Sequence, residues 1–288
     1  MAEQLNVIKS DTLTAVISNV GATLKKVTDK TGNEYIWQGD PASWQGSCPI
    51  LFPVCGGLNK NRFILDGKSY NLPRHGFIRF CEFEVVSHTQ NEIVYRFMSD
   101  KESFSKYPFV HEFFVTFSLR GNELSVTYGV KNNDRRTMFF SIGAHEGYAL
   151  DYPIEDYRLV FDKKDLPPVY SDTFEDINPS SVSYGDDGAL SLRFGWDQFE
   201  QGSVMMHPFN STKVSLVCDR SEKKLSVDLS EAEYLVFWTL PGARFLCIEP
   251  WNGISDPAEF SGEISEKEGI ISLKANECYR YTHKISFE

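Results

Sequence analysis

The chain has 288 residues, of which 41% are hydrophobic and 14% aromatic, so it carries enough apolar surface for a large core. Its 40 acidic residues outnumber 29 Lys and Arg residues, which gives a formal net charge of −11 at pH 7. That balance argues against nucleic acid or an anionic membrane surface as a partner, and it favours a neutral or locally captured small molecule.

The N-terminus and the cysteines predict a cytoplasmic protein. Residues 1–4 are polar and no apolar run follows them, so no secretory signal is expected. No stretch approaches the roughly 18 apolar residues of a membrane-spanning helix. The six cysteines form no Cys-x-x-Cys pair and mostly have apolar neighbours, which indicates buried free thiols in a reducing compartment and no metal site.

Short strand-like segments fill the first half of the chain. Asn, Asp and Gly turns separate segments that are rich in β-branched and aromatic residues. The dipeptide Asp66-Gly67, between the apolar run 63–65 and residues 69–72, predicts a two-stranded hairpin. Two prolines and a Gly-Gly pair argue against a helix at 48–57. Further strands are expected at residues 12–17, 23–28, 82–87, 92–97, 113–119 and 123–130.

The second half continues this pattern. Residues 163–201 are richer in Asp, Pro, Ser and Gly, but strand patterns resume after them, so we interpret them as a long excursion within one domain spanning 1–288. No long amphipathic helix is expected, only single helical turns at 230–234 and 258–260. Many short strands predict an all-β fold, either an antiparallel sandwich or a barrel. The strands expected here are at residues 139–150, 157–162, 214–218, 225–229, 235–238 and 245–248.

Glu249 is the first candidate for chemistry. It follows the apolar run 245–248 and precedes Pro250 and Trp251, so a buried strand is expected to end by placing a carboxylate beside an aromatic wall. Burial beside such a ring would raise the pKa of a carboxyl group toward neutrality, as a general base requires. The alternative is that Glu249 only pairs with an arginine.

Two of the six histidines and Arg62 complete the candidate set. His75 lies in a Leu-Pro-Arg-His-Gly-Phe run and His145 in an Ile-Gly-Ala-His run, where small neighbours let another group approach closely. Two imidazoles, one guanidinium and one carboxylate suit proton transfer on a neutral polyhydroxylated substrate. Of the other histidines, we expect two to be solvent-exposed, His88 and His283, and two to be structural, His111 and His207.

These motifs, in this order and rough spacing, resemble those of the aldose 1-epimerase (galactose mutarotase-like) superfamily, and most closely its LacX-like branch. The resemblance rests on Asn61-Arg62, on the two histidine runs and on the Cys-Ile-Glu-Pro-Trp run around Glu249, and it covers nearly the whole chain. It implies a large antiparallel β-sandwich of the galactose mutarotase type, with a sugar bound in a cleft on one curved sheet.

The resemblance also implies a role for each candidate in the interconversion of the α and β anomers of a hexose. Glu249 corresponds to the general base that takes the proton from the anomeric hydroxyl O1. His145 corresponds to the general acid that protonates the ring oxygen O5. His75 and Arg62 correspond to residues that hold and polarise sugar oxygens. No cofactor is implied, because no electrons move, and the expected partner is a small-molecule sugar.

Two stretches depart from the family's pattern, and the substrate therefore stays open. Gln201-Gly202-Ser203 stands where the family carries an aspartate that grips sugar hydroxyls, and Gly56-Gly57-Leu58 lacks the family's Gly-Arg pair. Trp251 or Phe77 is expected to stack on a pyranose face.

Two alternatives to a free-hexose epimerase follow from the same residues. Arg74 and Arg79 flank the His-Gly-Phe run, and because guanidinium forks suit phosphate, a hexose 6-phosphate is a second substrate class. Surface or loop-anchoring ion pairs would explain the same arginines. The other alternative is a sugar-binding or sensing protein without turnover, against which the retained acid–base residues argue. The sequence does not give the sugar, the pathway or the oligomeric state.

Overall fold

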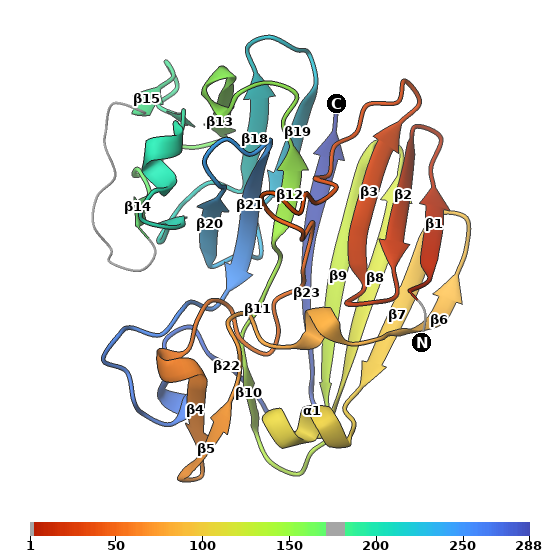
Figure 1. Ribbon diagram of the computed structural model, residues 1–288, viewed down its shortest axis with the longest axis vertical. Coiled ribbons are helices and arrows are strands. Elements are labelled where there is room, and N and C mark those ends of the chain that lie inside the picture. The colour runs from red at the N-terminus through yellow and green to blue at the C-terminus, as the bar shows by residue number, and fades with distance from the viewer. Residues whose placement is uncertain (1–2, 171–181) are drawn as a thin grey trace.

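The computed structural model describes residues 3–170 and 182–288, and most of its regular elements are β-strands (Figure 1). Ten strands form the largest sheet, and every neighbouring pair in it is antiparallel. In β8 buried and half-exposed residues alternate, so one face of this sheet packs into the core. Its strands, in spatial order, are β15 (Val182–Tyr184), β16 (Leu190–Leu192), β13 (Tyr157–Phe161), β18 (Lys213–Cys218), β19 (Lys224–Asp228), β23 (Cys278–Phe287), β9 (Glu123–Asn132), β8 (His111–Arg120), β7 (Glu92–Met98) and β6 (Glu84–His88).

A second, six-stranded sheet packs against the first and carries Glu249 and Trp251. Its strand β21 is buried along its whole length, because side chains alternate between two covered faces. Leu246 and Ile248 join the main core, whereas Phe245, Cys247 and Trp251 belong to clusters on the opposite face. The strands are β11 (Ile142–Gly143), β21 (Phe245–Asn252), β20 (Tyr234–Trp238), β17 (Val204–Met206) and β14 (Val169–Tyr170), with β12 (Glu146–Ala149) also paired to β21.

Three small sheets complete the described strands. The N-terminal sheet lies over the large one, where the Asn6 amide donates to the Tyr95 hydroxyl of β7 at 3.0 Å (Figure 1). The expected hairpin is confirmed: Asp66 and Gly67 both have positive φ, as a two-residue turn of this kind requires. The sheets are β1 (Leu5–Lys9), β2 (Leu13–Ser18) and β3 (Thr23–Asp29); β4 (Arg62–Leu65) and β5 (Lys68–Asn71); and β10 (Met138–Phe140) and β22 (Ile271–Leu273).

Helical structure in the described ranges is short. The α-helix α1 (Lys101–Lys106) was not expected from the sequence; its N-cap Asp100 accepts from the Ser103 amide at 2.8 Å. No helix in residues 3–170 and 182–288 is long and apolar enough to span a membrane. The 3₁₀ turns are η1 (Asn59–Asn61), η2 (Ile78–Phe80), η3 (Ile154–Asp156), η5 (Trp196–Phe199) and η6 (Ile264–Glu266).

The expected all-β sandwich is confirmed, and most strand ends lie within two residues of their predicted positions. Three expectations need correction. The segment 139–150 forms three strands rather than one, the strand expected to end at Ile248 continues to Asn252, and the stretches 230–234 and 258–260 contain no helical turn. Part of the expected excursion, residues 171–181, lies outside the described residues; around it, β14, β15 and β16 add strands to the two large sheets.

Candidate active site

A cavity of about 480 Å³ opens on the face of the six-stranded sheet that points away from the main core. Strands β20 and β21 form its floor, and loops around residues 44–49, 74–79 and 202–203 form its walls. Seven of the residues that line it have aromatic, imidazole or guanidinium side chains, and one has a carboxylate, so the cavity combines apolar walls with a few polar groups. The lining residues are Trp44, Pro49, Arg74, His75, Arg79, His145, Gly202, Ser203, Val236, Trp238, Glu249 and Trp251.

Glu249 and His145 face each other on neighbouring strands. Pairing to β21 stops after Gly143 of β11 and resumes at Glu146 of β12, so His145 occupies the unpaired step opposite Glu249. The same step explains why the strand tolerates Pro250: it needs no amide hydrogen bond there, and its carbonyl accepts from the Ala144 amide instead.

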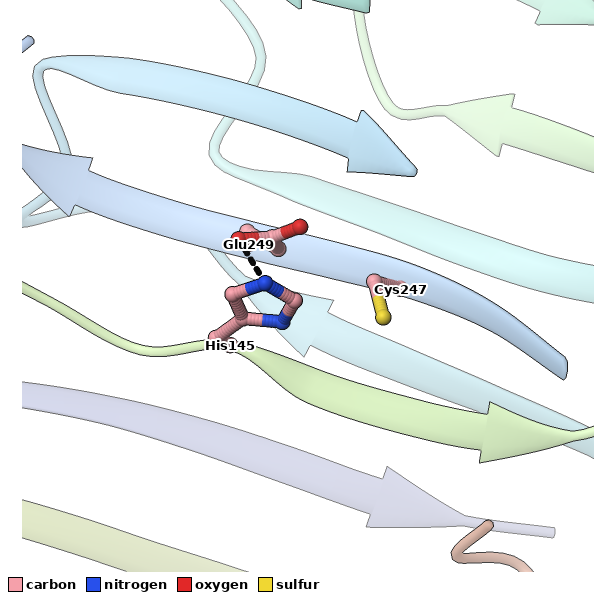
Figure 2. A group of neighbouring side chains, drawn as sticks. All are labelled: His145, Cys247 and Glu249. Atoms are coloured by element: carbon pink, nitrogen blue, oxygen red, sulfur yellow. Dashed lines mark ion pairs between the residues drawn. The ribbon is translucent and has the colours of Figure 1, made fainter. Parts of the chain in front are cut away.

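The imidazole of His145 points at the Glu249 carboxyl group, with 3.4 Å between Nε2 and Oε2 (Figure 2). Glu249 is 1% exposed and His145 is 8% exposed. Burial raises the pKa of Glu249 well above its ordinary value, and the nearby Glu146 adds to this shift. The pKa of His145 is lowered to about 3, mainly by burial, with smaller contributions from Arg79 and Arg74. Both shifts favour the uncharged form, in which Glu249 is protonated and His145 is a neutral imidazole. The pair therefore holds one transferable proton, and that proton lies on Glu249.

His75 adds a fixed hydrogen-bond donor to the cavity. Its Nδ1 accepts from the Gly56 amide at 3.1 Å, which leaves Nε2 as the protonated nitrogen. Burial lowers the pKa of His75 well below its ordinary value, and His145 contributes. The residue has a φ of 65°, a sparsely populated conformation for a non-glycine residue. The next residue must be glycine, because a Cβ on Gly76 would lie 2.2 Å from the Phe52 carbonyl oxygen.

The two expected phosphate-binding arginines both line the cavity. Arg79 donates from Nη2 to the Arg74 carbonyl at 3.0 Å and stacks on Phe80, while its Nε is buried without a hydrogen-bond partner. Neither guanidinium pairs with a carboxylate in the part of the chain that the structure describes. The Arg74 side chain lies close to Gly57, because a Cβ added there would be 3.5 Å from Arg74 Nη1. Arg74 therefore places a guanidinium beside Gly56-Gly57-Leu58, the stretch that lacks the family's Gly-Arg pair.

Arg62 does not line this cavity, contrary to expectation. Lys60 and Asn61 both have positive φ, and the chain turns there so that Arg62 begins β4 and pairs with Asn71. Its exposed side chain lines a separate hollow of about 40 Å³. Figure 1 shows the β4–β5 hairpin at the lower end of the view, below β21.

The aromatic residues were also assigned incompletely from the sequence. Phe77 packs into the main core and does not line the cavity. Trp251 is 3% exposed, donates to the Ala144 carbonyl at 3.1 Å and packs edge-on against His75, so it supports the wall.

Trp44 and Trp238 are the half-buried rings, and sequence reasoning missed both. Their ring centroids lie 5.3 and 5.7 Å from that of His145. A signal existed for Trp238, because strand alternation places it on the same face as Val236; the loop around Trp44 carries no comparable pattern.

The structure also places the stretch 201–203 and His283, for which expectations followed from the sequence. Gly202 and Ser203, from the stretch that lacks the family's aspartate, do line the cavity, and Glu249 is the one acidic residue among the described lining residues. His283, expected to be exposed, is 1% exposed, and its Nε2 lies 2.9 Å from Glu146 Oε1.

Comparisons with known proteins agree with this architecture. A family model for aldose 1-epimerase matches residues 4–286. The plasmid-encoded protein LacX of Lactococcus lactis subsp. lactis is 29% identical, with 97% of this chain and 98% of LacX aligned. A galactose mutarotase related enzyme from Lactobacillus acidophilus is 27% identical with a TM-score of 0.89, covering 99% of this chain and 97% of that one. A galactose mutarotase-like protein from Lactobacillus casei ATCC 334 is 26% identical with a TM-score of 0.87, covering 99% and 100%.

Proposed function

The chain belongs to the aldose 1-epimerase family, and we propose that it interconverts the α and β anomers of a hexose by acid–base opening and reclosure of the sugar ring. The observation that carries this proposal is the buried Glu249–His145 pair on the cavity wall. The two sugar oxygens that exchange protons, O1 and O5, are bonded to the same carbon, C1. A base and an acid 3.4 Å apart can therefore serve both oxygens of one bound sugar.

In the proposed reaction, Glu249 takes the proton from O1 while His145 gives a proton to O5. The C1–O5 bond breaks and C1 becomes the carbonyl carbon of an open-chain aldehyde. Rotation about C1–C2 presents the other carbonyl face. The ring recloses when His145 takes the O5 proton and Glu249 returns a proton to O1.

The pair carries one proton throughout this cycle. Ring opening begins with this proton on His145 and ends with a proton on Glu249, and reclosure reverses the change. The two half-reactions therefore start from different arrangements of the same number of protons. The Nε2–H of His75 and the guanidinium groups of Arg74 and Arg79 supply donors for sugar oxygens. Trp44 and Trp238 supply apolar rings for a pyranose face.

The test is anomer exchange measured by NMR on freshly dissolved α-glucose and α-galactose. Glu249→Gln keeps the shape of the side chain but removes the base, so exchange is expected to fall by about 10²–10⁴-fold while sugar binding persists. Glu259→Gln, at an exposed position, is the matched control and should exchange sugar like the parent. Full activity in Glu249→Gln would place the base elsewhere. A parent protein that binds these sugars but never exceeds the buffer rate would exclude an epimerase of free glucose and galactose.

A hexose 6-phosphate is the second candidate substrate, and the arginines favour it. Arg74 and Arg79, whose guanidinium groups have no carboxylate partner among the described residues, line the cavity of a chain whose formal net charge is −11. Phosphate oxygens would satisfy these donors, including the buried Nε of Arg79.

The two substrates can be separated by comparing kcat/KM for α-glucose and α-glucose 6-phosphate. Arg79→Gln removes a charge-assisted contact of about 1.5–3 kcal/mol and is expected to lower kcat/KM for the phosphate ester about 10–100-fold, with little effect on glucose. Arg62→Gln, outside the cavity, is the control and should change neither substrate. Equal losses on both substrates would mean that Arg79 serves the neutral part of the sugar.

A further inference from the structure

Cys247 is a buried thiol beside the acid–base pair, and the proposed reaction does not use it. It precedes Glu249 by two residues on β21, so both side chains project from the same face of the strand (Figure 2). One potential ligand atom from each of His145, Cys247 and Glu249 lies within 4.8 Å of the other two. All three residues are at most 8% exposed.

The spacing of these atoms is close to that of a tetrahedral zinc centre. Zn²⁺ binds imidazole nitrogen and carboxylate oxygen at about 2.0–2.1 Å, so two such ligands at a tetrahedral angle lie about 3.4 Å apart. His145 Nε2 and Glu249 Oε2 are separated by 3.4 Å. A thiolate bonded at about 2.3 Å would lie about 3.6 Å from either ligand, so the distances from Cys247 Sγ, which are within 4.8 Å, would shorten by up to about 1.2 Å.

We propose that His145, Cys247 and Glu249 form a binding site for Zn²⁺, in which the ion occupies the acid–base pair. Imidazole, thiolate and carboxylate are ligands that Zn²⁺ accepts together, and three protein ligands leave a fourth position for water. That position faces the cavity, which His145 and Glu249 line. Glu249 Oε2 is buried and has no hydrogen-bond partner, so a ligand atom is already directed into the site.

Binding exchanges protons for the metal ion. Zn²⁺ displaces the proton of the Glu249 carboxyl group and the proton of the Cys247 thiol, and both protons leave to solvent while neutral His145 donates its lone pair. Because the ion takes the place of the shared proton, a zinc-loaded site holds neither a free base nor a free acid. Micromolar zinc would then act as a reversible inhibitor; this last step rests on the proposed function, whereas metal binding does not.

The pattern of the sequence does not show this site. Cys247 and Glu249 are two residues apart, but His145 comes from a distant part of the chain and reaches them only because β12 pairs with β21. Strand β21 holds Cys247 and Glu249, and His145 lies directly before β12, so paired strands fix all three ligands as a defined metal geometry requires.

The test uses metal ions alone, on protein with the exposed thiol removed by Cys278→Ser, so that this surface cysteine cannot bind the probe. Co²⁺ is expected to bind with a stoichiometry of one and to give a thiolate-to-cobalt charge-transfer absorption, which Zn²⁺ then abolishes by displacement. Cys247→Ser should lose this absorption and bind Zn²⁺ at least about tenfold more weakly, since even loss of a partner outside the ligand set costs about 10–100-fold. Cys55→Ser removes a buried thiol on the same side of the sheet and should retain both properties.

Glu249→Gln provides a second variant, which should keep the absorption but weaken Zn²⁺ binding. The proposal is overturned if Co²⁺ gives no thiolate absorption, or if Cys247→Ser or Glu249→Gln binds Zn²⁺ as tightly as the parent. In a parallel assay, Zn²⁺ should stop anomer exchange and a chelator should restore it, with Cys247→Ser exchanging sugar normally but resisting zinc. A protein that binds the metal but shows no exchange without it would refute the proposed function and leave the metal site standing.

Discussion

Burial determines where the shared proton of Glu249 and His145 rests between turnovers. Both side chains are enclosed by strands and tryptophan rings, and burial outweighs the charge of Arg74 in raising the pKa of Glu249. The uncharged pair is therefore the resting form, and the charged form arises when a sugar supplies hydroxyl groups to solvate it. We therefore expect the Glu249–His145 pair to hold one transferable proton over a wide pH range.

The pH dependence of kcat/KM tests this assignment. The pair works with one proton, so activity should persist down to about pH 3, where His145 takes up a second proton. On the alkaline side it should fall only above the raised pKa of Glu249, when the last proton leaves. Arg74 and Arg79 lower the pKa that sets the acid limit, whereas Glu146 raises and Arg74 lowers the pKa that sets the alkaline limit.

The measurement is anomer exchange against pH with a chelator present, after subtraction of the spontaneous rate, with circular dichroism to confirm that the protein stays folded. A loss of activity centred near pH 4.5 or pH 6.5, the ordinary pKa values of a glutamate and a histidine, would contradict the prediction. Such a loss would show that solvent reaches the titrating group.

Single residues also show what the sequence could predict about the site. Glu249, His75 and His145 lie in motifs whose small and apolar neighbours have a direct structural meaning, and all three line one cavity. Arg62 was misplaced because its position depends on two consecutive residues with positive φ, which the Asn61-Arg62 motif does not reveal. Trp44 was missed because only the folded loop brings it to His145.

At the scale of elements, a buried ion pair anchors the segment after β21, which bonds to the loop at residues 56–59 that contacts His75. Lys267 Nζ lies 2.9 Å from Asp256 Oδ1, and both side chains are at most 2% exposed. The other oxygen of Asp256 accepts from the Asn59 amide at 2.9 Å, and the Asp256 amide donates to the Gly57 carbonyl. Gly57 adjoins Gly56, whose amide sets the tautomer of His75.

Removing the cation of this pair should be strongly destabilising. Lys267→Met leaves the Asp256 carboxylate buried without its counterion, so the free energy of unfolding, measured in urea, is expected to fall by about 3–5 kcal/mol. Lys106→Met breaks an exposed pair with Glu102 in α1 and should stay within about 0.5 kcal/mol of the parent. A small effect at Lys267 would mean that water reaches Asp256 and that the pair does not anchor the loops.

Strand β21 shows how far local pattern predicts an element. Four apolar residues ending at Ile248 correctly indicated a buried strand, and Pro250 reasonably suggested its end. The strand continues because the neighbouring strands β11 and β12 leave a gap beside Pro250. Such a gap is a property of the pairing between distant segments, which the sequence of one segment does not contain.

At the scale of the whole molecule, one buried hydrogen-bonded pair joins the two large sheets beneath the proposed site. Glu146 belongs to β12 of the six-stranded sheet and His283 to β23 of the ten-stranded sheet, and both side chains are at most 4% exposed. The rings of Tyr128 and Tyr281 lie within 6 Å of the His283 ring. The two residues are 137 positions apart, so their meeting depends on how the sheets stack, and the polar setting of His283 in the sequence gave the wrong expectation of exposure.

This pair links global stability to the chemistry of Glu249. His283→Leu leaves Glu146 between the sheets without this hydrogen-bond partner, and the free energy of unfolding should fall by about 1–3 kcal/mol. The double variant His283→Leu/Glu146→Met removes both polar groups and should recover most of that loss, because replacing both partners of a buried hydrogen bond by apolar groups of similar shape can be nearly neutral. Glu146 also raises the pKa of Glu249, so its removal should lower that pKa and move the alkaline limb of kcat/KM to lower pH. Urea unfolding and the pH profile measure the two effects separately: recovered stability with an unshifted limb would show that Glu146 serves the packing of the sheets and not the reaction.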